Sequence, residues 1–130
     1  MATRPSPHPM RSSPDADDAA VIERAYAAFN ARDIDAALEH MHPDVEWPNG
    51  MEGGVVIGHA AVRAYWERQW DRIDPSVTPV AIALRPDGRL DVRVHQVVRS
   101  LIGEKLLDQL VRHLYTIEDG RVRRMEIETE

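Results

Sequence analysis

The C-terminal part of the chain contains two predicted strands joined by an acidic-glycine turn, and this feature constrains the fold most. Residues 105–117 and 122–128 are rich in apolar and β-branched side chains, and Glu118-Asp119-Gly120 between them is typical of a β-hairpin turn. Alternate residues of the first strand share one face: Leu107, Gln109, Val111, His113, Tyr115 and Ile117. A glutamine and a histidine among apolar neighbours each need a hydrogen-bond partner or a function.

Two further strands are predicted directly before this hairpin, at residues 80–84 and 90–98. The segments 85–89 and 100–104 hold the glycine and polar residues that turns require. Four consecutive strands with no helix between them form an antiparallel sheet, and such a sheet twists strongly.

Helices are predicted in the first half of the chain. One begins after Ser13, which serves as N-cap, and covers about residues 14–31. Asp33 caps a second helix over 34–41, and a third covers about 59–73. Short extended pieces precede the third helix, and the order of elements indicates an α+β protein. We therefore expect three N-terminal helices packed on a strongly curved, mostly antiparallel sheet, with a conical cavity between them that suits a small ligand.

The composition fits a single folded domain over residues 14–130. Of the 130 residues, 43% are hydrophobic, which is enough for a core without metal or disulfide support. The chain has no cysteine, so disulfides, thiolate nucleophiles and zinc ribbons are excluded. The net charge of -6 argues against nucleic acid or an anionic membrane as the main partner.

Residues 1–13 contain three prolines and no apolar run, so we predict a disordered tail rather than a secretory signal. No segment approaches the ~20 apolar residues that span a bilayer. These features predict a cytoplasmic protein.

His40, His42, Asp44 and Glu46 are close in sequence, but their spacing does not suit a metal site. His40 lies near a helix end and Pro43 forces His42 into an extended conformation, so the four side chains do not converge. We expect no metal and no other cofactor.

Four motifs, in this order, resemble a known family: Val21–Asp33, His42–Trp47, Gly58–Tyr65 and Asp119-Gly120. Over about residues 18–128 the chain resembles SnoaL-like members of the superfamily that includes nuclear transport factor 2 (NTF2) and ketosteroid isomerase. The resemblance implies the NTF2-like cone. It implies little about chemistry, because the superfamily includes polyketide cyclases, isomerases, dehydratases, epoxide hydrolases and non-catalytic binding or dimerisation modules.

The chain departs from the isomerase branch at the positions that carry its chemistry. That branch uses a catalytic aspartate, a first-helix tyrosine and a strand acid. Here the aligned positions are Asn49, Ala25 and one near His113. An asparagine cannot accept a proton at neutral pH, and Tyr26 is rotated by roughly 100° from Ala25 around the helix. The resemblance therefore implies a reaction other than steroid isomerisation, or none.

His113 and Tyr26 are the candidate catalytic residues. An imidazole that faces an apolar cavity can exchange a proton near neutral pH. Tyr26 could present its hydroxyl to the same cavity as an acid or hydrogen-bond donor. The alternative is structural, with a core histidine bonded to a neighbour and a tyrosine ring in the apolar stripe of the helix.

Five residues are candidates for ligand binding: Trp47, Asn49, Met51, Trp66 and Gln109. The tryptophans supply flat apolar surface, and the two loop residues after the first strand could line the mouth of the cavity. Each also has a structural interpretation, as core residues, turn formers or, for Gln109, a hydrogen-bond partner.

Two functions remain open at this stage. The first is an enzyme that runs cofactor-free cyclisation, isomerisation or dehydration on a small hydrophobic carbonyl compound. The second is a ligand-binding or dimerising module without turnover, which the asparagine at position 49 favours. In both cases we expect a homodimer through the sheet, because Leu106, Leu110 and Leu114 are predicted on its outer face.

Overall fold

The computed structural model describes residues 16–129 and has an α+β architecture. Three helices and six strands follow one another in the order α1 Ala16–Asn30, α2 Ile34–Glu39, β1 Met41–Pro48, β2 Val55–Ile57, α3 His59–Trp70, β3 Asp74–Leu84, β4 Leu90–Arg99, β5 Lys105–Glu118 and β6 Arg121–Thr129. The predicted tail at 1–13 and the helix start at Ser13 lie outside the described residues. The helices are not all N-terminal to the sheet, because β1 and β2 precede α3.

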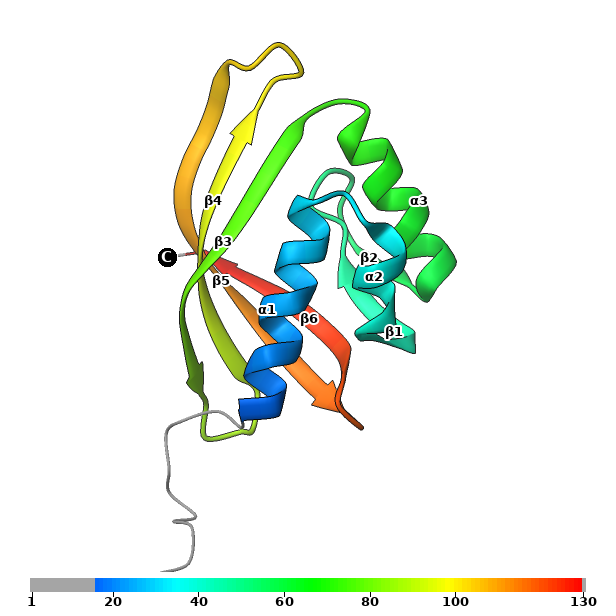
Figure 1. Ribbon diagram of the computed structural model, residues 1–130, viewed down its shortest axis with the longest axis vertical. Coiled ribbons are helices and arrows are strands. Elements are labelled where there is room, and N and C mark those ends of the chain that lie inside the picture. The colour runs from blue at the N-terminus through cyan, green and yellow to red at the C-terminus, as the bar shows by residue number, and fades with distance from the viewer. Residues whose placement is uncertain (1–15, 130) are drawn as a thin grey trace, which may run out of the picture.

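The six strands form one sheet in the order β2-β1-β6-β5-β4-β3. All neighbours are antiparallel except β1 and β6, which run parallel and bring the first strand beside the last. The sheet curves around α1, while α2 and α3 lie beside β1 and β2 (Figure 1). This arrangement forms the predicted curved sheet with its helices on the concave side.

The helices form where their apolar residues recur at helical spacing. Ile22 and Tyr26 of α1 are almost fully buried, four residues apart on one face of the helix. The side chain of Asp33 accepts a hydrogen bond from the Ala36 backbone at 3.1 Å and so caps α2 as predicted. None of the helices in the described residues is long and apolar enough to cross a membrane.

Strand β3 is longer than the sequence predicts and begins at Asp74, before two prolines. Pro75 and Pro79 lie in an edge strand of the sheet, where a missing N–H can face away from the ladder. The pairing with β4 shifts between Pro79 and Ala81, which is the irregularity expected at such a residue. The third helix ends correspondingly earlier, at Trp70 rather than near residue 73.

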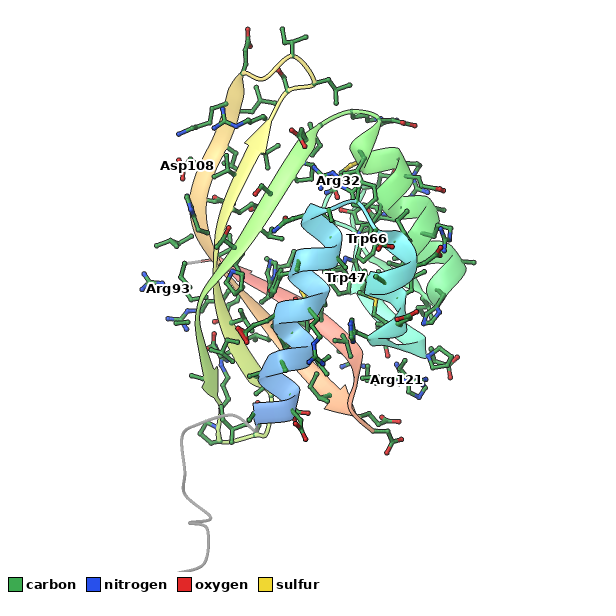
Figure 2. The ribbon with its side chains drawn as sticks, viewed as in Figure 1. Arg32, Trp47, Trp66, Arg93, Asp108 and Arg121 are labelled. Carbon is green, nitrogen blue, oxygen red and sulfur yellow. The ribbon has the colours of Figure 1, made fainter. Side chains whose placement is uncertain are left out.

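The two faces of the sheet differ in character. Trp47 and Trp66 lie between sheet and helices, whereas Arg93 and Asp108 lie on the side away from the helices (Figure 2). Leu106 and Leu110, predicted on the outer face, are 56% and 40% exposed.

Leu114 was also expected to need covering by a partner, and this expectation is wrong, because its side chain is only 4% exposed in the single chain. It stands opposite Asp91, whose carboxylate binds Arg85 and Arg112. Long arginine side chains therefore converge beside Leu114, and their aliphatic stems can cover it.

Candidate active site

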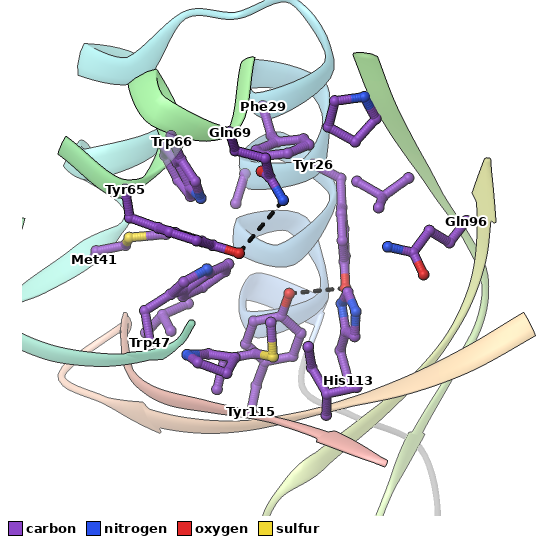
Figure 3. Close-up of a pocket in the computed structure, with 17 residues that line it drawn as sticks. Tyr26, Phe29, Met41, Trp47, Tyr65, Trp66, Gln69, Gln96, His113 and Tyr115 are labelled. Atoms are coloured by element: carbon purple, nitrogen blue, oxygen red, sulfur yellow. Dashed lines mark hydrogen bonds between the residues drawn. The ribbon is translucent and has the colours of Figure 1, made fainter. Parts of the chain in front are cut away.

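A cavity of about 80 Å³ lies between the concave face of the sheet and helices α1 and α3 (Figure 3). Seven helices and strands contribute residues to its lining. None of these residues, all in the described part of the chain, has an acidic or basic side chain of the Asp, Glu, Lys or Arg type. The lining residues are Ala25, Tyr26, Phe29, Met41, Trp47, Pro48, Tyr65, Trp66, Gln69, Pro75, Val77, Gln96, His113, Tyr115, Val122, Met125 and Ile127. Ile127 is 47% exposed, so the cavity reaches the surface near the end of β6.

The register of the sheet points His113 into this cavity. His113 pairs with Val92 of β4 and with Ile127 of β6, and Tyr115 two residues later pairs with Leu90 and Met125. Side chains two apart on a strand share a face, so both rings point towards the helices. His113 is 6% exposed and Tyr115 is 2% exposed. His113 therefore lies on the inner face of the sheet, among the residues that line the cavity.

Tyr26 links these two side chains through its hydroxyl. Its oxygen lies 2.7 Å from Nδ1 of His113, and the hydroxyl of Tyr115 donates to the same oxygen at 2.8 Å. The rings of Tyr26 and His113 are also stacked, with centroids 5.9 Å apart and planes inclined by 20°. The three residues therefore form a continuous hydrogen-bonded chain at one side of the cavity (Figure 3).

Burial holds all three groups in their neutral forms near neutral pH. Loss of solvation lowers the pKa of His113 to about 4, because the charged imidazolium is poorly solvated there. Burial raises the pKa of Tyr26 well above its ordinary value, and the neighbouring Tyr115 raises it further. Burial also raises the pKa of Tyr115, partly offset by its hydrogen bond to Tyr26.

A second polar pair lies on α3. The Tyr65 oxygen accepts hydrogen bonds from the Gly50 backbone at 3.1 Å and from Nε2 of Gln69 at 3.4 Å. Figure 3 shows the Tyr65 hydroxyl directed towards the centre of the cavity. Burial raises the pKa of this phenol as well, so it also stays neutral at physiological pH.

The two predicted tryptophans line the cavity, whereas three other predicted ligand residues do not. Trp47 and Trp66 meet edge to face with ring centroids 5.6 Å apart. The Asn49 side chain is engaged with Glu52, and it both donates to the carboxylate at 2.9 Å and accepts from the backbone at 2.8 Å. This is the turn-forming arrangement that was the alternative for Asn49.

Met51 and Gln109 also lie outside the set of lining residues. Met51 packs against the hydrophobic core as a partly buried side chain. Gln109 is exposed, and its Nε2 donates to Oε1 of Gln96 across the two strands at 3.0 Å. Gln96, rather than Gln109, therefore presents an amide to the cavity.

The histidine and acid cluster near β1 is dispersed among separate partners. Nδ1 of His42 accepts from the Asp44 backbone at 3.0 Å, and Glu46 contacts Arg123 and Arg124 at 3.2 Å. Within residues 16–129 no group of three or more potential metal ligands converges. The cluster therefore provides ion pairs and a local turn.

Sequence reasoning missed four polar lining residues: Tyr65, Gln69, Gln96 and Tyr115. Tyr115 follows His113 by two, so strand periodicity already placed it on the same face, but its ring was counted as core. Tyr65 and Gln69 are four residues apart on α3 and therefore share a helix face. Their hydroxyl and amide could have been identified as polar groups on an otherwise apolar face.

Comparisons with known proteins agree with this architecture. The sequence model of the SnoaL-like domain matches residues 22–125. TerC, crystallised with polyporic acid, is 31% identical, with a TM-score of 0.77 and coverage of 88% of this chain and 92% of TerC. No significant match to a curated protein was found.

Two further solved structures share the fold at lower identity. An NTF2-like protein of unknown function from Burkholderia pseudomallei K96243 is 24% identical, with a TM-score of 0.77 and coverage of 89% of this chain and 92% of that one. A protein named as a polyketide cyclase from Sinorhizobium meliloti is 24% identical, with a TM-score of 0.69 and coverage of 84% and 94%. At this identity the similarity concerns the fold alone.

Proposed function

The chain belongs to the SnoaL-like domain family, and we propose that it binds a small hydrophobic carbonyl compound in the cavity and catalyses cofactor-free proton transfer on it. Cyclisation, isomerisation and dehydration are reactions of this type. His113 is the proposed proton-transfer group, and Tyr26 is the polar partner that orients its ring. The observation that carries the proposal is the 2.7 Å contact between these two residues inside an apolar cavity.

The cavity walls support a flat, hydrophobic ligand. Trp47, Trp66 and Phe29 contribute aromatic surface, and polar groups are few and placed at two opposite sides. This combination of apolar walls with a few convergent polar groups is typical of small-molecule sites. The relative TerC has been crystallised with polyporic acid, so this compound is a suitable first ligand to test.

Binding and turnover can be measured separately. Quenching of tryptophan fluorescence on addition of polyporic acid reports occupation of the cavity, because Trp47 and Trp66 line it. Exchange of carbon-bound hydrogen for deuterium in a hydrophobic ketone such as 2-tetralone, followed by NMR in D₂O, reports proton transfer. Native mass spectrometry of the purified protein would identify a ligand that co-purifies with it.

The variant His113→Ala tests the assigned role. A positioned proton-transfer group contributes a rate factor of ~10² to 10⁴, so a loss of less than tenfold in turnover would remove His113 from this role. Gln109→Ala is the matched control, because Gln109 lies outside the cavity lining. Circular dichroism of both variants establishes that each is folded.

A binding module without turnover is the second candidate, and a specific observation favours it. Asn49, aligned with the isomerase aspartate, is engaged in a turn with Glu52, and no carboxylate lines the cavity in the described part of the chain. Binding of polyporic acid with no exchange of carbon-bound hydrogen would support the module and contradict the enzyme.

We also propose that the protein forms a homodimer through the outer face of the sheet. Val80 on β3 and Leu106 and Leu110 on β5, the two strands that flank β4, are 53%, 56% and 40% exposed. Burial of such side chains in a second copy would remove apolar surface from water. Light scattering should give twice the mass of the chain, and Leu110→Lys should give a monomer, whereas a wild-type monomer would contradict the proposal.

A further inference from the structure

The direction of hydrogen bonding around Tyr26 decides where His113 carries its hydrogen. The hydroxyl of Tyr115 is buried and has one acceptor among the described residues, the Tyr26 oxygen at 2.8 Å. Tyr26 therefore accepts from Tyr115 and uses its own hydrogen to donate to Nδ1 of His113 at 2.7 Å. A neutral imidazole that accepts at Nδ1 carries its hydrogen on Nε2.

The opposite arrangement leaves a buried hydroxyl without an acceptor. If Nδ1 carried the hydrogen and donated to Tyr26, Tyr26 would donate to Tyr115. The Tyr115 hydrogen would then have no acceptor within residues 16–129. The free energy of an unsatisfied buried donor biases the two tautomers by about tenfold or more. The chain of three residues thus selects the tautomer with hydrogen on Nε2.

This Nε2 opens on the cavity. His113 lines the cavity, and its Nε2 makes no hydrogen bond to the described part of the chain. In the described residues, two fully enclosed side-chain atoms lack a hydrogen-bond partner, Nε1 of Trp70 and Oδ1 of Asp91. Nε2 of His113 is not one of them, so this atom is not sealed inside the protein. The Nε2 hydrogen is therefore available to a bound ligand.

A second donor faces the cavity from α3. The Tyr65 oxygen accepts from Gly50 and Gln69, and no described residue accepts the Tyr65 hydrogen. If the Gln69 amide turned over, Tyr65 would donate to its Oε1, and the amide N–H groups would lack acceptors instead. Either orientation leaves at least one donor of this pair for a ligand.

A third donor comes from Gln96 on β4. Its Oε1 already accepts from Gln109 at 3.0 Å, which leaves its amide nitrogen with hydrogens to donate. Figure 3 shows this nitrogen turned towards the cavity. Donors therefore predominate among the polar groups of the lining, and the lining side chains include no carboxylate that could accept from a ligand.

We infer that Tyr26 is a positioning residue that keeps the His113 hydrogen on Nε2, and that the cavity selects a ligand with an acceptor oxygen, as in a carbonyl, enolate or phenolate. The inference rests on the proposed function, because it names the ligand class of the same cavity. In the proposed proton transfer, His113 then serves as the acid that donates to the ligand oxygen, where negative charge develops, rather than as the base that takes a proton from carbon.

NMR of the ¹⁵N-labelled protein tests the positioning role without any ligand. The nitrogen shifts of His113 near neutral pH should identify the Nε2–H tautomer in the wild type. In Tyr26→Phe the two tautomers should become mixed, because no hydroxyl of residue 26 then donates to Nδ1. Tyr115→Phe is the control and should keep the hydrogen on Nε2, because Tyr26 still donates to Nδ1. An Nδ1–H tautomer in the wild type, or no change in Tyr26→Phe, would overturn the inference.

Binding of 4-nitrophenol and nitrobenzene tests the ligand class. Both are flat single rings, but only the phenolate presents a negatively charged oxygen, and its absorbance reports ionisation in the bound state. We expect at least tenfold tighter binding of 4-nitrophenol than of nitrobenzene and a lower pKa for the bound phenol. Tyr26→Phe should reduce this preference, because part of the His113 population then lacks a hydrogen on Nε2.

Tyr65→Phe is the matched variant, because it should reduce the same preference with no change in the His113 tautomer. Equal affinity for the two probes would overturn the ligand class. Failure of both probes to bind, with the hydrogen still on Nε2, would contradict the proposed function and support the role of Tyr26.

Discussion

The side-chain amide of Asn30 makes two hydrogen bonds to the backbone of Val77. Its Nδ2 donates to the carbonyl oxygen at 2.7 Å, and its Oδ1 accepts from the amide nitrogen at 3.0 Å. Asn30 is the last residue of α1, and Val77 lies in the edge strand β3. The side-chain amide of Asn30 therefore pairs with the backbone of the edge strand in the way that a neighbouring strand would. This pair fixes the end of α1 one turn beyond Tyr26 and thereby helps to place the Tyr26 hydroxyl against His113.

Asn30→Ala should lower the free energy of unfolding by about 1–2 kcal/mol. Two hydrogen bonds are lost, each worth roughly 0.5–1.5 kcal/mol, and the partial exposure of Asn30 lets water replace part of them. Urea denaturation followed by circular dichroism measures the change. Asn30→Asp, which keeps an acceptor for the Val77 N–H but loses the donor, should fall between the wild type and Asn30→Ala. An alanine variant as stable as the wild type would show that the pair does not hold the helix.

The turn between β5 and β6 gives a second prediction, at Gly120. Its φ is +74°, and a Cβ built there would meet no atom within 4 Å. Gly120→Ala should therefore lower stability by about 1 kcal/mol through backbone strain alone. Gly50→Ala is the control, because Gly50 lacks a positive φ and its Cβ would meet the Tyr65 oxygen at an ordinary 3.6 Å. Thermal unfolding of both variants separates strain from contact, and equal losses would contradict this explanation.

The hydroxyl of Tyr26 gives a third prediction, because it serves two partners. Tyr26→Phe removes the acceptor of Tyr115 and the donor to His113, and should lower stability by about 2 kcal/mol. Adding Tyr115→Phe removes the hydroxyl that was left unsatisfied. The double variant should therefore be less destabilised than the sum of the two single variants. Additive losses in a double-mutant cycle would show that the two hydroxyls act independently.

Much of the fold follows from local patterns in the sequence. The hairpin at Asp119-Gly120 was predicted from two residues, and the structure confirms it with φ values of 53° and 74°. The start of β3 was predicted too late because Pro75 was treated as a break. An edge position makes that proline acceptable, and edge positions depend on the order of strands in the whole sheet. The parallel pairing of β1 with β6 likewise joins segments about 80 residues apart, which no local pattern specifies.

The candidate site could be predicted only in part. Strand periodicity placed His113 on the inner face, and helix periodicity placed Tyr26 on the buried stripe of α1. Their hydrogen bond depends on how α1 crosses the sheet, which the sequence pattern does not specify. Gln109 shares its strand face with His113, but it lies where the curved sheet extends beyond the helices, and so it is exposed.

The buried imidazole of His113 predicts a loss of stability in acid. Its pKa is about 4 in the folded protein and about 6.5 when unfolded, so between these values the unfolded chain binds a proton that the native state does not. The contribution of neutral His113 to the free energy of unfolding is fully present above pH 6.5. It is lost as the pH falls towards 4, and the total loss is about 3 kcal/mol. Urea unfolding at several pH values in this range should give a shallower pH dependence for His113→Gln than for the wild type. Gln109→Ala, which removes no titratable group, should keep the wild-type dependence, and equal slopes for His113→Gln and the wild type would show that His113 titrates alike in both states.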